Sequence, residues 1–222
     1  MGGPHGHQLH FHGHSRVHRA PAHLKILALL AFMLVVVATP RGWYPLYGGH
    51  LAALVTVVLL SRVPPVYLLK RMVVEVPFVF FAILLPFVAT GPRTEFLGLT
   101  VSESGLHAGA ALLAKATLGV LASLTLAATT EPQDLLAGLA RLRMPVLLVQ
   151  IMGFMVRYLE VVTDELRRMR IARESRGFTA RNPRHWPVLA RSFGALFIRS
   201  FERGERVHLA MLSRGYTGKM PT

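Results

Sequence analysis

The chain has 222 residues, of which 52% are hydrophobic and 16% are charged, and its formal net charge is +14. Soluble domains carry about 25% charged residues, so the composition favours a membrane protein over a soluble one. The chain has no cysteine, which excludes disulfide bonds, thiol catalysis and thiolate metal sites.

The first segment, residues 1–23, is polar and rich in histidine. Seven of the 11 histidines lie in it: His5, His7, His10, His12, His14, His18 and His23. Because imidazole binds cobalt, nickel, copper and zinc, the segment predicts weak metal binding, with five candidate ligands: His5, His7, His10, His12 and His14. Two interpretations stay open. The segment captures or buffers a metal, or it is a disordered tail with incidental affinity.

Four apolar blocks follow, at residues 24–39, 46–61, 72–90 and 106–128. A membrane-spanning helix needs roughly 20 residues, with about 17 as the lower limit, so the first two blocks are short and need flanking residues. Four blocks in succession, separated by turns rich in proline and glycine, predict a bundle of about four membrane-spanning helices over residues 24–130.

Two charged residues and two prolines interrupt these blocks. Pro77 and Pro86 predict kinks in the third block. Glu75 and Lys115 stand inside apolar sequence, where charge usually marks a functional or paired residue. The sequence leaves open whether these two side chains pair with each other.

Lysine and arginine alternate in number from loop to loop. Three lie before or at the start of the first block (Arg16, Arg19 and Lys25), and the next three loops hold one, three and one; sixteen follow the fourth block. Cytoplasmic loops carry the excess of these residues. We therefore expect the N-terminus, the second loop and the C-terminal region in the cytoplasm.

The C-terminal region holds most of the positive charge. Residues 141–222 carry sixteen bases and six acids, a net charge of +10. Such a region suits anionic lipid, nucleic acid or an acidic protein. The sequence has no recognised nucleic-acid-binding motif and no interleaving of basic and aromatic residues, so no nucleic acid partner is expected.

The same region contains two similar units that are offset by 38 residues. In each, an apolar stretch leads into a charged helical segment that stops at a glycine. The ends coincide, because Ser175-Arg176-Gly177-Phe178-Thr179 matches Ser213-Arg214-Gly215-Tyr216-Thr217. A glycine in the left-handed conformation closes a helix, and arginine in the last turn suits the helix dipole. Ordinary caps explain one such end, whereas the ordered repeat favours a shared function.

These residues resemble the T component of energy-coupling factor (ECF) transporters, and within it the CbiQ type of cobalt and nickel importers. The resemblance covers residues 131–217, through both Ser-Arg-Gly ends together with Arg157-Tyr158, Asp164-Glu165 and Ala210-Met211. The short motif of the family is Ala-Arg-Gly or a close variant. Here serine replaces alanine in both copies, and the arginine–glycine core is kept.

The resemblance implies an all-α fold, a polytopic membrane bundle with long coupling helices on the cytoplasmic side, over residues 131–222, in a bacterial inner membrane. Each motif-bearing end would dock in a groove of one subunit of a cytoplasmic ABC ATPase dimer. Arg176 and Arg214 would pair with acidic residues there, and Ser175, Gly177, Ser213 and Gly215 complete the motifs. ATP-driven closure of the dimer would then tilt a membrane substrate-binding (S) component.

An amphipathic helix is predicted where Glu131-Pro132-Gln133-Asp134 precedes Leu135, Leu136, Leu139 and Leu142. In the family a comparable segment helps to bind the S component. A connector packed on the bundle is the alternative.

Three functions remain open at this point. The first is coupling in a cobalt or nickel importer, and the second is the same role for a vitamin such as biotin. The third is a membrane-embedded enzyme, but His50, His107, His185 and His208 are scattered and no catalytic constellation is evident. A Gly-rich phosphate loop is also absent, so a non-catalytic subunit without a cofactor is expected.

Overall fold

The computed structural model describes residues 16–90, 92–96, 99–179 and 182–218. Its elements, in chain order, are α1 (Arg16–Arg19), α2 (Ala22–Ala38), α3 (Tyr44–Ser61), α4 (Pro65–Arg71), η1 (Met72–Glu75), α5 (Val76–Val88), β1 (Arg93–Phe96), β2 (Leu99–Ser102), α6 (Glu103–Thr129), α7 (Pro132–Arg141), α8 (Val146–Glu174), η2 (Pro183–His185) and α9 (Trp186–Leu212). The predicted all-α fold is confirmed, since the strands form only a two-stranded antiparallel hairpin between α5 and α6.

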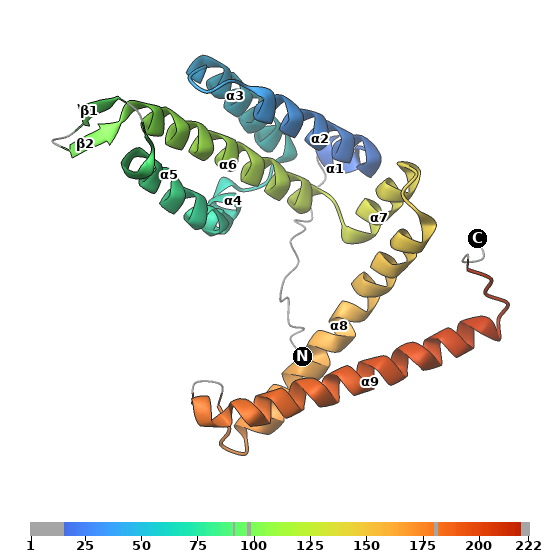
Figure 1. Ribbon diagram of the computed structural model, residues 1–222. Coiled ribbons are helices and arrows are strands. Elements are labelled where there is room, and N and C mark those ends of the chain that lie inside the picture. Colours follow the sequence, from blue (N-terminus) through green and yellow to red (C-terminus); the bar gives the residue numbers. More distant parts are fainter. Residues whose placement is uncertain (1–15, 91, 97–98, 180–181, 219–222) are drawn as a thin grey trace. The chain divides into compact units, whose positions relative to one another are not determined.

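The chain divides into two compact units, Met1–Gly138 and Leu139–Thr222. The division falls inside α7, whereas the coupling region is predicted to begin at residue 131, just before this helix. In the first unit α6 is the central helix and contacts α2, α3, α4 and α5 (Figure 1). In the second unit α8 and α9 pack against each other.

Four helical segments in the described part of the chain are long and apolar enough to cross a membrane: Tyr44–Ser61, Val66–Val88, Glu103–Thr129 and Val146–Glu174. Two of them contain the second and fourth predicted blocks, and Val66–Val88 covers the third block, residues 72–90, as far as residue 88. The first block corresponds to α2, whose 17 residues are at the lower limit for a span. The fourth segment, α8, lies outside the four predicted blocks. It joins the predicted apolar stretch to the charged helical segment that follows it, in one helix of 29 residues.

The third span starts before the predicted block, and its α-helix is interrupted by a 3₁₀ turn next to a proline. The span starts with α4 at Pro65, because a proline, which has no N–H, is tolerated in the first turn of a helix. A 3₁₀ turn, η1, lies directly before Val76 and Pro77, and Pro86 lies inside α5. Since Pro77 cannot donate to the preceding turn, the helix changes its hydrogen-bonding pattern there.

The core of the first unit is small, and most of its apolar surface faces outward. One cluster joins Val36 of α2, Tyr47 and Leu54 of α3, and Leu118 and Ala122 of α6. By contrast, many large apolar side chains on the outer faces of the helices are more than half exposed. An exposed apolar surface of this extent needs lipid around it.

Glu75 and Lys115 do not pair with each other. The buried carboxylate of Glu75 accepts a hydrogen bond from the Thr117 hydroxyl of α6. The Lys115 Nζ donates to the Val37 carbonyl, 2.8 Å away, close to the end of α2. Each charge therefore joins two helices through a different partner, and Lys115 satisfies a terminal carbonyl that lipid would leave unbonded.

Two glycines one helical turn apart allow α6 to approach α5 closely. A Cβ at Gly105 would lie 2.7 Å from the Leu85 carbonyl oxygen, and one at Gly109 would lie 2.5 Å from that of Ala82. Small residues at this spacing let the backbones of membrane helices come together.

We predict that Gly109→Ala destabilises the protein by about 1–3 kcal/mol, because the added methyl group overpacks the α5–α6 contact. Thermal unfolding in detergent measures the change. The matched control is Gly49→Ala in α3, where a Cβ meets nothing within 4 Å. Equal unfolding temperatures for the two variants would contradict the close contact.

Candidate functional site

The candidate site consists of the two Ser-Arg-Gly ends, one following α8 and one following α9. The backbone at both ends has the same hydrogen bonds. The Gly177 amide donates to the Glu174 carbonyl (3.0 Å), and the Phe178 amide donates to that of Arg173 (3.1 Å). The corresponding bonds after α9 are Gly215 to Leu212 (2.9 Å) and Tyr216 to Met211 (3.0 Å). This pair of bonds defines a Schellman motif.

The conformation of the two glycines explains why the repeat keeps them. Gly177 has φ +79° and Gly215 has φ +81°, in the left-handed region that costs a residue with a Cβ about 1–2 kcal/mol. The predicted glycine caps are therefore confirmed. A Cβ at either position would meet nothing within 4 Å, so the conformation of the backbone, and not crowding, requires glycine here.

The two serines are also equivalent. The Ser175 hydroxyl donates to the Ala172 carbonyl, and the Ser213 hydroxyl donates to the Ala210 carbonyl, each over 3.0 Å. Both serines thus bond back to their own helix, one turn earlier. Arg176 and Arg214 are exposed, and within the described residues neither guanidinium has an ion pair, so both remain available to a partner.

The aromatic residues after the glycines make different contacts. The Phe178 ring meets the His185 ring edge to face, with centroids 5.3 Å apart. The Tyr216 hydroxyl donates to Gln150 Oε1 of α8 over 2.9 Å. The first end is therefore fixed to the start of α9, and the second to the start of α8.

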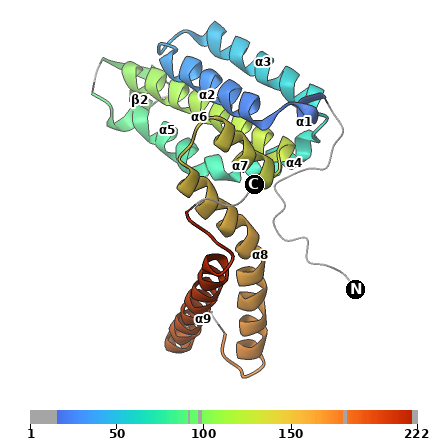
Figure 2. The same ribbon diagram turned by 90° about the vertical axis from the view of Figure 1, so that its right-hand side faces the viewer.

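A carboxylate holds the two helices together between these ends. Glu165 of α8 accepts from Arg199 (2.9 Å) and pairs with Arg203 (3.6 Å), both on α9. The helices are antiparallel and meet at the loop that joins them (Figures 1 and 2). Because the first end adjoins the start of α9 and the second follows its last residue, they lie about one α9 length apart, or about 40 Å for 27 residues.

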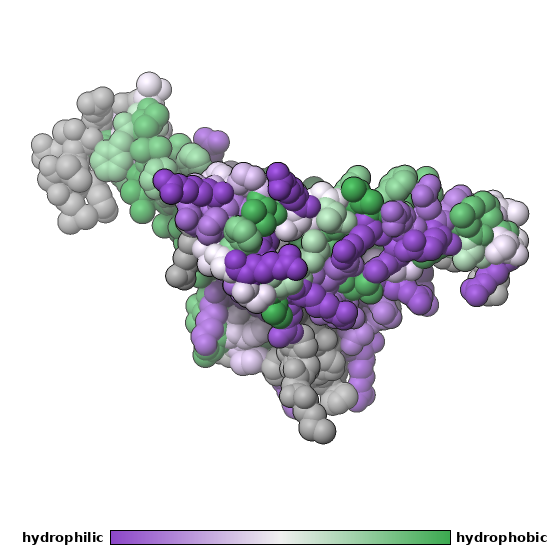
Figure 3. Space-filling view, turned by 90° about the horizontal axis from the view of Figure 1, so that it is seen from below, coloured by the Kyte–Doolittle hydropathy of each residue, from purple (hydrophilic) through white to green (hydrophobic). Residues whose placement is uncertain are grey.

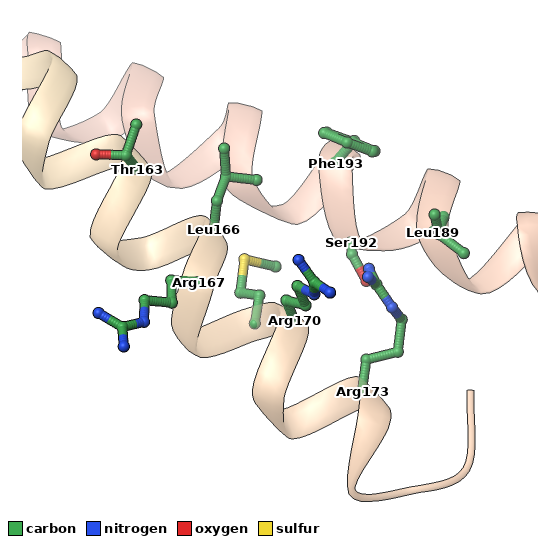
Figure 4. Close-up of a pocket in the computed structure, with 9 residues that line it drawn as sticks. Thr163, Leu166, Arg167, Arg170, Arg173, Leu189, Ser192 and Phe193 are labelled. Atoms are coloured by element: carbon green, nitrogen blue, oxygen red, sulfur yellow. The ribbon is translucent and has the colours of Figure 1, made fainter. Parts of the chain in front are cut away.

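A cavity lies between α8 and α9 beside the Glu165 contact (Figure 4). Its α8 wall includes three arginines, and its α9 wall includes Leu189, Ser192 and Phe193. In Figure 4, Arg170 and Arg173 point toward α9, whereas Arg167 points away. Arg170 pairs with Glu174 (2.8 Å), and the buried Nε of Arg173 has no hydrogen-bond partner among the described residues.

The surface around these helices is mainly hydrophilic. Seen from below, hydrophilic residues predominate, and smaller hydrophobic patches lie among them (Figure 3). Two of the arginines, Arg199 and Arg203, bridge from α9 to Glu165 of α8. Two others, Arg176 and Arg214, stand at the ends of the helices.

The candidate metal ligands His5, His7, His10, His12 and His14 lie outside the described residues. Within the part of the chain that the structure describes, no group of three or more histidine, aspartate or glutamate side chains is placed to hold a metal. The prediction of a metal-binding tail stays a prediction.

Sequence reasoning missed two contacts near the coupling region. One is the Glu165 bridge, although Asp164-Glu165 belongs to the sequence pattern that carries the family resemblance. The other involves Lys25, whose Nζ donates to the Thr129 carbonyl (2.9 Å) and the Thr130 hydroxyl (3.2 Å), where α6 ends. In addition, a Cβ at Gly138 would lie 2.9 Å from the His23 amide nitrogen. The first part of α7 therefore packs on the bundle.

The fold and the paired helix ends together define a multi-pass membrane protein with an attached pair of charged helices. Residues 13–222 match the family of cobalt transport proteins, CbiQ, and the chain belongs to this family. It is the transmembrane T component of an energy-coupling factor transporter. T components are non-catalytic, and membership of the family implies a complex with ATPase subunits and an S component.

Individual relatives agree with this assignment. The chain is 30% identical over 225 residues to the energy-coupling factor transporter transmembrane protein EcfT of Bacillus subtilis, covering 93% of this chain and 82% of that protein. It is 28% identical over 202 residues to the cobalt transport protein CbiQ of Rhodobacter capsulatus, covering 88% and 78%. An uncharacterized protein of Methanocaldococcus jannaschii is 34% identical over 122 residues, which are 55% of this chain and 46% of that protein.

We predict that Gly215→Ala loosens the turn after α9 by about 1 kcal/mol, because alanine is strained at positive φ. The Tyr216 amide should then exchange its hydrogen about fivefold faster, since each 1.4 kcal/mol is a tenfold change in an equilibrium. Hydrogen exchange measures this. Gly204→Ala, in the interior of the same helix with nothing near its Cβ, is the control. Unchanged exchange at Tyr216 would show that the turn does not need glycine.

Proposed function

We propose that the two Ser-Arg-Gly ends are the points at which this T component docks on a cytoplasmic ABC ATPase dimer. The observation that carries the proposal is the repeated turn. Two ends with the same backbone hydrogen bonds, the same left-handed glycine and an exposed arginine follow two antiparallel helices. Two equal docking elements, about one helix length apart, suit two equivalent subunits of one partner.

The chemistry of the arginines supports an acidic groove as the receiving site. A guanidinium presents a planar set of donors that fits a carboxylate in two parallel hydrogen bonds. The rigid turn fixes the backbone at the base of each side chain, so less conformational freedom is lost when the arginine binds. Ser175 and Ser213 contribute by bonding to their own helices, and Gly177 and Gly215 contribute by closing the turns.

The helix pair transmits the movement of the ATPases in this proposal. Because Glu165 joins α8 to Arg199 and Arg203, closure of the dimer moves both helices together. That movement tilts the S component. The N-terminus, the second loop and the C-terminal region then lie on the cytoplasmic side of a bacterial inner membrane, in agreement with the distribution of lysine and arginine.

We propose cobalt, or nickel, as the transported ion. The family is described as that of cobalt transport proteins, and one relative carries this name. The histidine-rich segment at residues 1–23 adds ligands of the type that these metals prefer. The name of the EcfT relative gives no substrate, so it does not favour the vitamin alternative.

For α7 we propose the role of a connector packed on the bundle. The close approach of Gly138 to the start of α2 supports this role. Contact with the S component through the leucine face is the second candidate, supported by the amphipathic pattern alone.

We predict that Arg176→Glu and Arg214→Glu each weaken assembly with the ATPase pair by about 2 kcal/mol, or about thirtyfold in affinity, because each removes a hydrogen bond between charged groups. The double variant should fail to assemble. Co-purification and titration of the ATPases onto the chain in nanodiscs measure the effect. Arg191→Glu is the matched control, since Arg191 is an exposed arginine of α9 that belongs to neither turn. Equal binding by all variants would contradict the docking role.

We predict that cells carrying the complete transporter take up labelled cobalt or nickel, and that the double variant Arg176→Glu/Arg214→Glu abolishes uptake. Both measurements use the same cells, with membrane insertion checked by immunoblot. If neither metal enters while a vitamin does, the substrate proposal is wrong and the coupling role stands.

A further inference from the structure

Given the docking role proposed above, on which this inference rests, we propose that Tyr216 is a positioning residue. It ties the second Ser-Arg-Gly end to the start of α8, so that the two ends differ in the helix that they move. The contact is a single hydrogen bond, in which the Tyr216 hydroxyl donates to Gln150 Oε1 over 2.9 Å. Because the two residues are 66 positions apart, the bond joins the chain after α9 to the first turns of α8.

The first Ser-Arg-Gly end lacks this link. Phe178 stands at the position that matches Tyr216 in the 38-residue offset, and it has no hydroxyl. Its ring meets the His185 ring instead, with centroids 5.3 Å apart, and the Thr179 amide donates to His185 Nδ1 over 3.1 Å. His185 comes directly before α9. The first end is therefore held to the start of α9, and the second to the start of α8.

Two contacts at a distance from each other fix the angle between α8 and α9. Near the loop, Glu165 of α8 bridges to Arg199 and Arg203 of α9. Gln150 lies 15 residues before Glu165, which is about 22 Å along the helix and about 60° around its axis. Among the described residues, no other hydrogen bond or ion pair joins α8 to the chain after Arg203. Held only near the loop, α9 would pivot about the Glu165 bridge, and the Tyr216 bond at the far end removes this freedom.

The position of Gln150 gives the bond a second consequence. It is the only residue with an amide, hydroxyl or charged side chain in residues 146–156, the apolar first part of α8. Gln150 and Tyr216 are both half-buried, and a polar group that leaves water needs a partner. The chain after α9 turns back toward the start of α8 (Figures 1 and 2) and supplies this partner.

The equal turns at the two ends therefore lead to unequal connections. A movement of the second end reaches the apolar start of α8 directly, through the Tyr216 bond. A movement of the first end reaches the start of α9 through the His185 contacts. Two equivalent ATPase subunits would thus act on different parts of the helix pair, and each part is addressed by contiguous contacts.

The chain has no cysteine, so a single introduced cysteine can carry an environment-sensitive fluorophore. One sample is labelled at Leu147→Cys, at the start of α8, where the leucine is 63% exposed. A second sample is labelled at Arg191→Cys, in the first half of α9, where the arginine is also exposed. Each is assembled with the ATPase pair and the S component in nanodiscs, and the change in emission on addition of ATP is recorded.

Two substitutions are compared in both labelled chains. Tyr216→Phe removes only the hydroxyl that bonds to Gln150. Thr163→Val is the matched control, because the Thr163 hydroxyl bonds to carbonyls of its own helix, those of Leu159 and Glu160. The affinity for the ATPases is titrated for every variant, so that docking and movement are measured separately.

We expect Tyr216→Phe to bind the ATPases as tightly as the unmodified chain, because Arg214 and its turn are intact. The ATP-driven change at position 147 should be about fivefold smaller, since one hydrogen bond accounts for about this factor in an equilibrium. The change at position 191 should stay the same. Gln150→Leu should act like Tyr216→Phe, and the two together should be no worse than either, because both remove the same bond. Thr163→Val should alter neither label.

Four results overturn the proposal. The label at position 147 responds to ATP equally with and without the Tyr216 hydroxyl, or does not respond in the unmodified chain. Both labels lose their response together in Tyr216→Phe, which indicates a general loss of structure. Tyr216→Phe binds the ATPases more weakly, which makes Tyr216 part of the docking contact. The effects of Tyr216→Phe and Gln150→Leu add. The docking role fails on a different measurement, the titration of Arg176→Glu and Arg214→Glu, so the two failures are distinguished.

Discussion

Lipid offers no hydrogen bond to a peptide group, and the first unit is built around this constraint. Its helices satisfy their own backbones except at their ends, where the last carbonyls have no partner. Two lysines bond to such carbonyls. Lys115 donates to Val37 near the end of α2, and Lys25 donates to Thr129 at the end of α6. Both lysines, which are charged residues in apolar sequence, therefore bond to carbonyls at helix ends. Glu75, in the 3₁₀ turn beside Pro77, accepts a hydrogen bond from Thr117 instead.

The second unit meets the same requirement by a different means. After α8 and α9, the terminal carbonyls accept from the amide of each left-handed glycine and from the amide of the aromatic residue that follows it. These bonds come from the backbone at both ends, which leaves Arg176 and Arg214 available to a partner. In the first unit, a lysine ammonium group bonds to the terminal carbonyl, so this charge is not available to a partner. In the second unit, backbone amides bond to the terminal carbonyls, so the neighbouring arginine remains available.

The sequence predicted those features that depend on local spacing. The 38-residue offset predicted equal helix ends, and the structure has equal hydrogen bonds there. The apolar blocks predicted helices, with errors at their limits: the third span begins earlier, at α4, because Pro65 can start a helix. Contacts between distant residues could not be read in this way. Glu165 meets Arg199 across 34 positions and Lys25 meets Thr129 across 104, and no periodicity within either segment specifies the partner.

The helix α9 shows how one element can carry several roles without conflict. Its inner side packs on α8 through Leu196 and the arginines that bridge to Glu165. Its C-terminal end carries the exposed Arg214 on a turn closed by a left-handed glycine. Because the pairs with Glu165 set which side of α9 faces α8, one helix holds both the contact within the pair and the arginine that is proposed to dock.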